Sequence, residues 1–97
     1  MKAIFISSNQ ALYDEIVSIM DGLGIRGFTC WDTVTGRGSN TGEPHYGSHA
    51  WPTLNSAVMT FVDDEIVDTF LDRLDKLDKE SEVQGLRAFC WDITKSV

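Results

Sequence analysis

The stretch NSAVMTFVDDEIVDTFLDRLDKL, residues 55–77, contains the two patterns from which the fold can be predicted. Its first eight residues are mostly β-branched or apolar, which predicts a strand over Asn55–Val62. Three acids follow at Asp63–Glu65, and negative charge stabilises a helix that begins there. Apolar residues then recur at the three- and four-residue spacing of a buried helical face, namely Ile66, Val67, Phe70, Leu71, Leu74 and Leu77.

The chain opens with the same order of a strand and then a helix. Lys2–Ser7 is β-rich, and Ser8–Asn9 supplies residues that cap helices. Gly22 and Gly24 lie where this helix should end, and Arg26–Thr35 is rich enough in β-branched and aromatic residues to predict a second strand. The apolar face of the helix consists of Leu12, Tyr13, Ile16, Val17, Met20 and Leu23.

A polar connection at Lys79–Gly85 and a fourth strand over Leu86–Ile93 complete the order β-α-β-β-α-β. With right-handed crossovers, this order predicts an α+β fold in which a four-stranded antiparallel sheet carries both helices on one face. The expected strand order is fourth, first, third, second. Cys30 and Cys90 then lie on opposite edges, too far apart for a disulfide within one chain. The 97 residues make a single domain over 1–97.

Charge and hydropathy disfavour several classes of partner. Fifteen acidic residues against eight basic ones give a formal net charge of −7, and no cluster of Lys and Arg stands apart. Nucleic-acid binding needs such a cluster to displace counterions from phosphates, so we expect no nucleic-acid partner. No apolar run approaches the roughly 18 residues of a membrane span, and the amino-terminal residues lack the pattern of a signal peptide. We therefore expect a cytoplasmic protein.

Both faces of the expected sheet carry apolar side chains. In the third strand Ala57, Met59 and Phe61 point one way, while Val58 and Val62 point the other way. Two helices can cover only one face, so the other face would expose large apolar groups. Since burial of apolar area contributes ~25 cal/mol per Å², exposed groups of this size favour association. We therefore predict a closed oligomer with these faces turned inward.

The segment Gly36–Thr53 differs in composition from the rest of the chain. It contains four glycines, both prolines and both histidines, and almost no aliphatic residue. A connection of this length in a compact domain is uncommon unless it is functional or mobile, so we expect a long flexible loop over about 36–53. His45 and His49 have a spacing that can bind zinc on a helix, but Pro44 and Gly47 disfavour a helix. We expect two solvated histidines and no metal.

The sequence gives no pattern typical of an enzyme. No Ser or Cys nucleophile lies beside a plausible base, and neither paired carboxylates in an expected pocket nor a Walker-type loop is present. The run Gly36-Arg37-Gly38-Ser39-Asn40 is by itself a weak phosphate signal, because ordinary turns use the same residues. We expect a protein that is not an enzyme and has no cofactor.

Three segments together resemble the nitrogen-regulatory PII signalling proteins. They are GIRGFT at Gly24–Thr29, the glycine-rich loop after the second strand, and VDDEIVD at Val62–Asp68. The resemblance runs roughly over Met1–Ile93 and implies a ferredoxin-like subunit in a homotrimer, with ligand clefts between neighbouring subunits. It also implies a signalling role, in which a nucleotide-type effector such as ADP, AMP or ATP is sensed. The long loop would then dock on a membrane transporter, an enzyme or a regulator.

The resemblance implies specific site residues as well. Thr29 matches a position that lines the adenine pocket of the family, and Arg87 lies near a basic position that meets phosphate. Gly36, Arg37 and Gly38 resemble the glycine-rich loop base that wraps the phosphates in the family. Gly85 is the one glycine that remains in the segment before the fourth strand. The residues expected to contact a partner protein are His45, Tyr46 and His49.

The connection at Lys79–Gly85 departs from the family pattern of Thr-Gly followed by Gly-Asp-Gly-Lys. Glu80 and Glu82 would repel a triphosphate, which favours ADP, AMP, a cyclic nucleotide or a small anion over ordinary ATP binding. Two alternatives stay open. One is a metal-responsive trimer of the divalent-cation tolerance type that uses His45 and His49, and the other is an interaction module that binds no small ligand.

Overall fold

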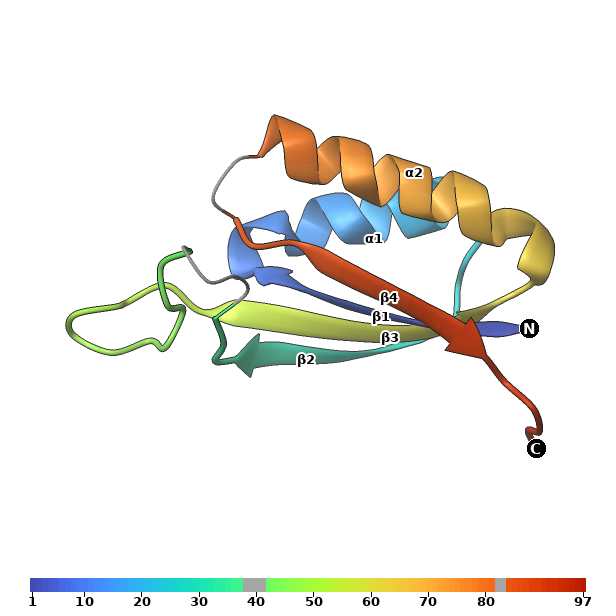
Figure 1. The fold of residues 1–97 in the computed structure, drawn as a ribbon, viewed down its shortest axis with the longest axis horizontal. Helices are drawn as coiled ribbons and strands as arrows, with labels where there is room; N and C mark the ends of the chain where they lie inside the picture. The colour runs from blue at the N-terminus through green and yellow to red at the C-terminus, as the bar shows by residue number, and fades with distance from the viewer. Residues whose placement is uncertain (38–41, 82–83) are drawn as a thin grey trace.

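The architecture expected from the sequence is confirmed in a computed structural model that describes residues 1–37, 42–81 and 84–97. The four strands of this part of the chain form an antiparallel sheet in the order β2-β3-β1-β4, and both helices pack on one face of it (Figure 1). The elements are β1 (Lys2–Asn9), the 3₁₀ turn η1 (Gln10–Leu12), α1 (Tyr13–Gly22), β2 (Phe28–Val34), β3 (Asn55–Val62), α2 (Asp64–Glu80) and β4 (Arg87–Asp92).

The bounds of β1 and β2 differ from the expected ones for local reasons, and β4 is one residue shorter at each end. Strand β1 continues to Asn9 because this residue still pairs with Asn55, and the Asn9 side chain accepts a hydrogen bond from the Ala11 N–H at 2.9 Å. That bond closes a 3₁₀ turn, so the α-helix begins only after it. Strand β2 begins late because the chain first turns through Gly24, whose φ of 76° suits glycine.

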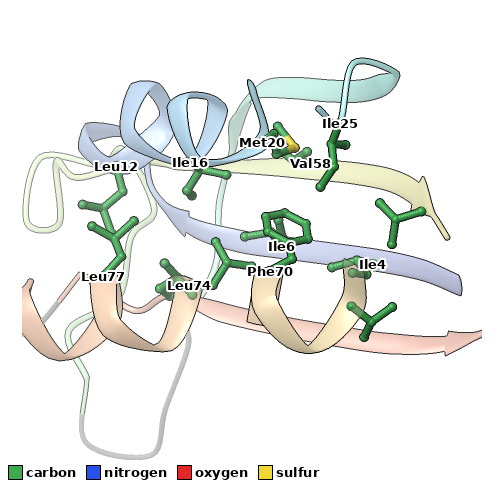
Figure 2. Close-up of a cluster of buried hydrophobic side chains, with 13 residues drawn as sticks. Ile4, Ile6, Leu12, Ile16, Met20, Ile25, Val58, Phe70, Leu74 and Leu77 are labelled. Atoms are coloured by element: carbon green, nitrogen blue, oxygen red, sulfur yellow. The ribbon is translucent and has the colours of Figure 1, made fainter. Parts of the chain in front are cut away.

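The core lies between the helices and the face of the sheet that they cover (Figure 2). Ile4 and Ile6 of β1 and Val58 of β3 are at most 1% exposed and pack against side chains from both helices. The edge strands β2 and β4 contribute apolar groups to the same face. These groups are Phe28, Cys30, Ala88 and Cys90, and both thiols are free.

The opposite side of the sheet has no cover within the described residues, and we call it the uncovered face. Cross-strand pairs place Phe89, Phe5, Met59 and Thr29 in one row across β4, β1, β3 and β2. Side chains in the neighbouring rows remain half exposed, among them Phe61 at 52%. The full face consists of Ala3, Phe5, Ser7, Thr29, Trp31, Ala57, Met59, Phe61, Arg87, Phe89 and Trp91. Of the helices in the described residues, none has the length and hydropathy of a membrane span.

Candidate functional site

A cavity of about 290 Å³ lies where the base of the 36–53 loop meets β1 and the start of β4. Strand β1 brings Ser7 to it, and the two ends of the loop bring Gly36 and Asn55. The cavity thus joins parts of the chain that are far apart in sequence. Its lining consists of Ser7, Gly36, Arg37, Asn55, Gly85, Arg87 and Phe89.

Four of the residues expected to bind a ligand therefore line one cavity in the structure. Gly36 and Arg37 come from the start of the loop, whereas Gly85 and Arg87 come from the connection that leads into β4. Gly38, which was expected to join them, lies outside the described residues. The structure supplies the proximity of these four residues; their binding role remains a proposal.

The two arginines of the cavity have no acidic partner within ion-pair distance among the described residues. Arg87 Nη1 donates to the carbonyl oxygen of Leu86 at 3.0 Å, which leaves other guanidinium donors available. Asp75 and Asp78 line an adjoining cavity beyond Arg87 without pairing with it. Two guanidinium groups that have no acidic partner among residues 1–37, 42–81 and 84–97 lie at one cavity, and such groups suit an oxyanion such as phosphate or bicarbonate.

A pair of backbone hydrogen bonds closes the base of the loop. The Gly36 N–H donates to the His45 carbonyl oxygen at 3.0 Å, and the His45 N–H donates to the Gly36 carbonyl oxygen at 2.7 Å. His45 Nδ1 lies 2.6 Å from Asn55 Oδ1, and since an amide oxygen only accepts, Nδ1 carries the proton. We call Gly36, His45 and Asn55 the latch.

Burial of the latch corrects an expectation from the sequence. His45 is only 8% exposed and Asn55 only 4%, so His45 is not a solvated loop histidine. The glycine at position 36 is explained by the same packing, because a Cβ there would lie 3.0 Å from the amide nitrogen of Asn55. At Gly85, the φ of 66° favours glycine, and the His45 ring lies beside it.

The segment that the latch closes, residues 45–54, forms a hydrogen-bonded turn that we call the tip segment. The Gly47 N–H donates to the Thr53 carbonyl at 3.1 Å, and the Ser48 N–H donates to the Trp51 carbonyl at 2.9 Å. The Trp51 N–H in turn donates to Ser48 Oγ at 3.1 Å. Tyr46, His49 and Trp51 are exposed on this segment, whose bonding the sequence did not predict.

Among the described residues that are expected to bind a ligand, Thr29 does not line the cavity of its own chain. It lies on the uncovered face in β2, opposite Met59, whereas the cavity involves the start of β4 at the other edge of the sheet. Three cavity residues were in turn not identified from the sequence: Ser7, Asn55 and Phe89. Strand alternation could have indicated two of them, because Ser7 pairs with Arg87, and Phe89 follows Arg87 by two residues.

The remaining candidate chemistry concerns metal ligands and the thiol of Cys30. Within them, no group of three or more His, Cys, Asp or Glu side chains lies close enough to hold a metal ion. Burial raises the pKa of the Cys30 thiol, and the nearby Asp32 carboxylate acts in the same direction. A raised pKa keeps this thiol protonated near neutral pH, where only the thiolate is a strong nucleophile.

Comparison with known proteins adds a family and a set of similar folds. The family model described as nitrogen regulatory protein P-II matches residues 1–96. No curated protein matches the chain. The fold is similar to that of CPII from Thiomonas intermedia K12, a nitrogen regulatory PII-like protein solved with ADP, AMP and bicarbonate; the TM-score is 0.77 at 19% identity, over 95% of this chain and 84% of CPII.

Two further solved structures show the same fold. CPII bound to ADP and bicarbonate gives a TM-score of 0.76 at 20% identity, covering 95% of this chain and 84% of that one. A putative PII-like signalling protein from Thermus thermophilus gives a TM-score of 0.69 at 23% identity, covering 93% of this chain and 83% of that one. These identities are low, so the structural likeness concerns the fold alone.

Proposed function

The chain belongs to the nitrogen regulatory P-II family, and from this premise we propose that it is a cytoplasmic signalling protein whose effector is an anionic, nucleotide-type molecule. The effector binds in the cavity at the base of the loop. The observation that carries this proposal is the convergence of Arg37 and Arg87, from distant parts of the chain, on one cavity without an acidic partner in the described residues.

The size of the cavity favours a site that is completed by a second copy. At about 290 Å³ it lies at the lower limit of the roughly 300–1,000 Å³ typical of ligand pockets, enough for an anionic group and too small for a well-covered nucleotide. Arg87 and Phe89 also belong to the uncovered face, so a copy packed on that face would add a second wall. Thr29 can reach an effector there only from such a copy.

The proposed assembly is a closed homotrimer in which the uncovered faces meet at the centre. Trp31, Phe61, Phe89 and Trp91 are 45–58% exposed in one chain, and an aromatic side chain can bury 150–250 Å². Together they leave roughly 400 Å² of apolar surface, and exposed patches of this size are often functional. Small-residue positions between them, such as Ala3 and Ala57, would allow close approach.

The effector class follows from charge and from the relatives. Two guanidinium groups balance about two negative charges, which suits a nucleoside monophosphate or diphosphate or bicarbonate better than a triphosphate. The exposed Glu80 at the end of α2 adds negative charge to the connection that leads to Gly85. CPII, which has a similar fold, was solved with ADP, AMP and bicarbonate.

The proposed output is a change in the tip segment, which docks on a transporter, an enzyme or a regulator. Tyr46, His49 and Trp51 are exposed there, and exposed aromatic groups are frequent anchors at protein interfaces. Effector binding alters docking only if the effector binds two arrangements of the loop with different affinity. Binding of the regulated partner is therefore expected either to lower or to raise the affinity of the chain for the effector.

Calorimetric titration with AMP, ADP, ATP and bicarbonate tests the binding site. We expect Arg37→Ala and Arg87→Ala each to weaken the best of these probes by about 10-fold or more, since each removes charge-assisted hydrogen bonds. Arg73→Ala is the matched control, because it removes the same charge from the helical layer. Unchanged affinity in both cavity variants would refute the assigned site, and no binding of any probe would favour the interaction module that binds no small ligand.

A further inference from the structure

We propose that His45 and Asn55 are positioning residues of the effector site: their hydrogen bond holds Arg37 at the cavity and couples the cavity to the tip segment. This inference rests on the proposed function, since it concerns the regulation of the same site. The sequence predicts this role for neither side chain, because it indicates a solvated residue at His45 and the first residue of a strand at Asn55.

The first step concerns how Arg37 is held. Its backbone follows directly from Gly36, whose N–H and C=O both bond to His45, at 3.0 and 2.7 Å. These two bonds fix the peptide from which Arg37 projects. The His45 ring cannot drift from this position, because Nδ1 donates to Asn55 Oδ1 at 2.6 Å and both side chains are buried. The arginine is therefore oriented through residues that do not themselves carry charge to the effector.

The second step concerns the tip segment. The tip begins at His45 and its last residue, Leu54, immediately precedes Asn55, so the His45–Asn55 hydrogen bond closes both ends of the segment at once. The Leu54 carbonyl oxygen also accepts a hydrogen bond from the Gln10 N–H at 3.0 Å, which anchors the segment to the start of η1, directly after β1. One side-chain bond is thus shared by the wall of the cavity and the base of the exposed turn.

The third step concerns the shared wall. Asn55 itself lines the cavity with Gly36 and Gly85. The His45 ring lies beside Gly85, since a Cβ atom added to Gly85 would be 3.8 Å from His45 Cε1. An anion drawn to Arg37 and Arg87 therefore acts on residues that also hold the tip. Because packed groups of this kind shift together, displacement at the cavity is transmitted to the turn that carries Tyr46 and Trp51.

The test uses the full chain, with AMP and inorganic phosphate as probes in calorimetric titrations. His45→Phe keeps a ring in the buried position and removes the donor, whereas His45→Asn restores an N–H donor close to the place of Nδ1. We expect the phenylalanine variant to bind AMP about 10-fold more weakly and the asparagine variant to bind within about threefold of the parent. Melting temperature reports whether each variant is folded.

A double-mutant cycle separates positioning of Arg37 from a general loss of structure. If His45 acts through Arg37, then His45→Phe should weaken AMP binding by less than about twofold in an Arg37→Ala background. In an Arg87→Ala background the same change should still weaken binding by about 10-fold. Coupling to the tip is measured in parallel by NMR: AMP should shift the Trp51 indole and Ser48 amide signals in the parent and not in His45→Phe.

Each outcome decides one of the two proposals. AMP binding that depends on both arginines but not on His45 would overturn the positioning role and leave the proposed function intact. Equal losses in the Arg37→Ala and Arg87→Ala backgrounds would also overturn it, since they indicate general destabilisation. No binding of AMP or phosphate by the parent would overturn the proposed function and this inference together. If His45→Phe does not fold, Asn55→Ser removes the amide acceptor of the same bond and replaces it in the cycle.

Discussion

The two faces of the sheet are built from the same four strands, but only one of them is covered by the helices. On the face that the helices cover, Ile4, Ile6 and Val58 are at most 1% exposed. On the uncovered face, the alternate residues include Phe61 at 52% and Phe89 at 58% exposure. Two neighbouring residues of one strand can therefore serve two purposes, since successive side chains of a strand point to opposite sides.

This difference separates what one chain needs in order to fold from what it needs in order to act. The covered face completes its packing within the chain, which explains why the fold can be derived from short-range patterns. In the proposed assembly the uncovered face is completed by other copies of the chain, and the proposed effector cavity opens beside this face through Arg87 and Phe89. In the proposed trimer, assembly and ligand binding thus depend on the same surface.

The largest expected effect comes from truncating one phenylalanine on each face. Phe70 of α2 is fully buried against the sheet, so Phe70→Ala should lower the free energy of unfolding by about 3–5 kcal/mol at any protein concentration. Phe61→Ala is the matched control with the same atoms removed. Because Phe61 is exposed in one chain, its loss should appear mainly as a lower stability at low protein concentration. Urea unfolding at two protein concentrations measures both.

The distinction between the faces would fail if the two truncations behaved alike. Equal and concentration-independent losses would mean that Phe61 is part of the folding core of one chain. A negligible loss at Phe70 would instead mean that α2 does not provide the cover that its packing in Figure 2 indicates.

The next expected effect concerns assembly. Phe61→Glu places a charge on the uncovered face, where burial of an unpaired carboxylate is strongly unfavourable, so the proposed trimer should dissociate. Thr69→Glu adds the same charge on the exposed side of α2 and should leave assembly unchanged. Sedimentation velocity distinguishes a trimer of 10.8 kDa chains from a single chain. A parent protein that sediments as a single chain at micromolar concentration would contradict the proposed assembly.

The comparison of faces also explains what the sequence could predict. The strand over Asn55–Val62 and the helix after it were predicted because local periodicity and a run of acids specify them. Strand alternation alone predicts that Phe61 and Val62 point to opposite faces of the sheet. For these elements, each residue is placed by its near neighbours in the sequence.

The site was predicted less completely, for a physical reason. Gly36, Arg37, Gly85 and Arg87 were expected from a family resemblance, whereas their meeting at one cavity depends on the sheet register. Burial of His45 depends on Asn55, ten residues later, and glycines around the loop permit many paths between them. No local pattern indicates a contact of this kind, so the sequence alone predicts a solvated histidine in this polar loop.

The smallest expected effect concerns how the covering helix is attached at its first turn. The Met1 amino group lies 2.9 Å from Asp64 Oδ1, which joins the start of β1 to the start of α2. This hydrogen bond and the charge of the amino group lower the pKa of the Asp64 carboxyl in the folded chain. Since the folded pKa lies below that of the unfolded chain, the pair stabilises the fold above about pH 3.9, and this contribution is lost as the pH falls through the folded pKa.

Asp64→Asn should therefore lower the melting temperature slightly between about pH 5 and 7, and the difference from the parent should vanish near about pH 2. Glu65→Gln is the matched control, because it removes an acid from the same helical turn without removing an ion pair seen in the described residues. Melting curves across this pH range, on a chain with a free Met1 amino group, measure the effect. If both variants show the same pH dependence, the effect comes from the helix dipole, which acts on both acids. The ion pair between Met1 and Asp64 would then make no specific contribution to holding α2 against β1.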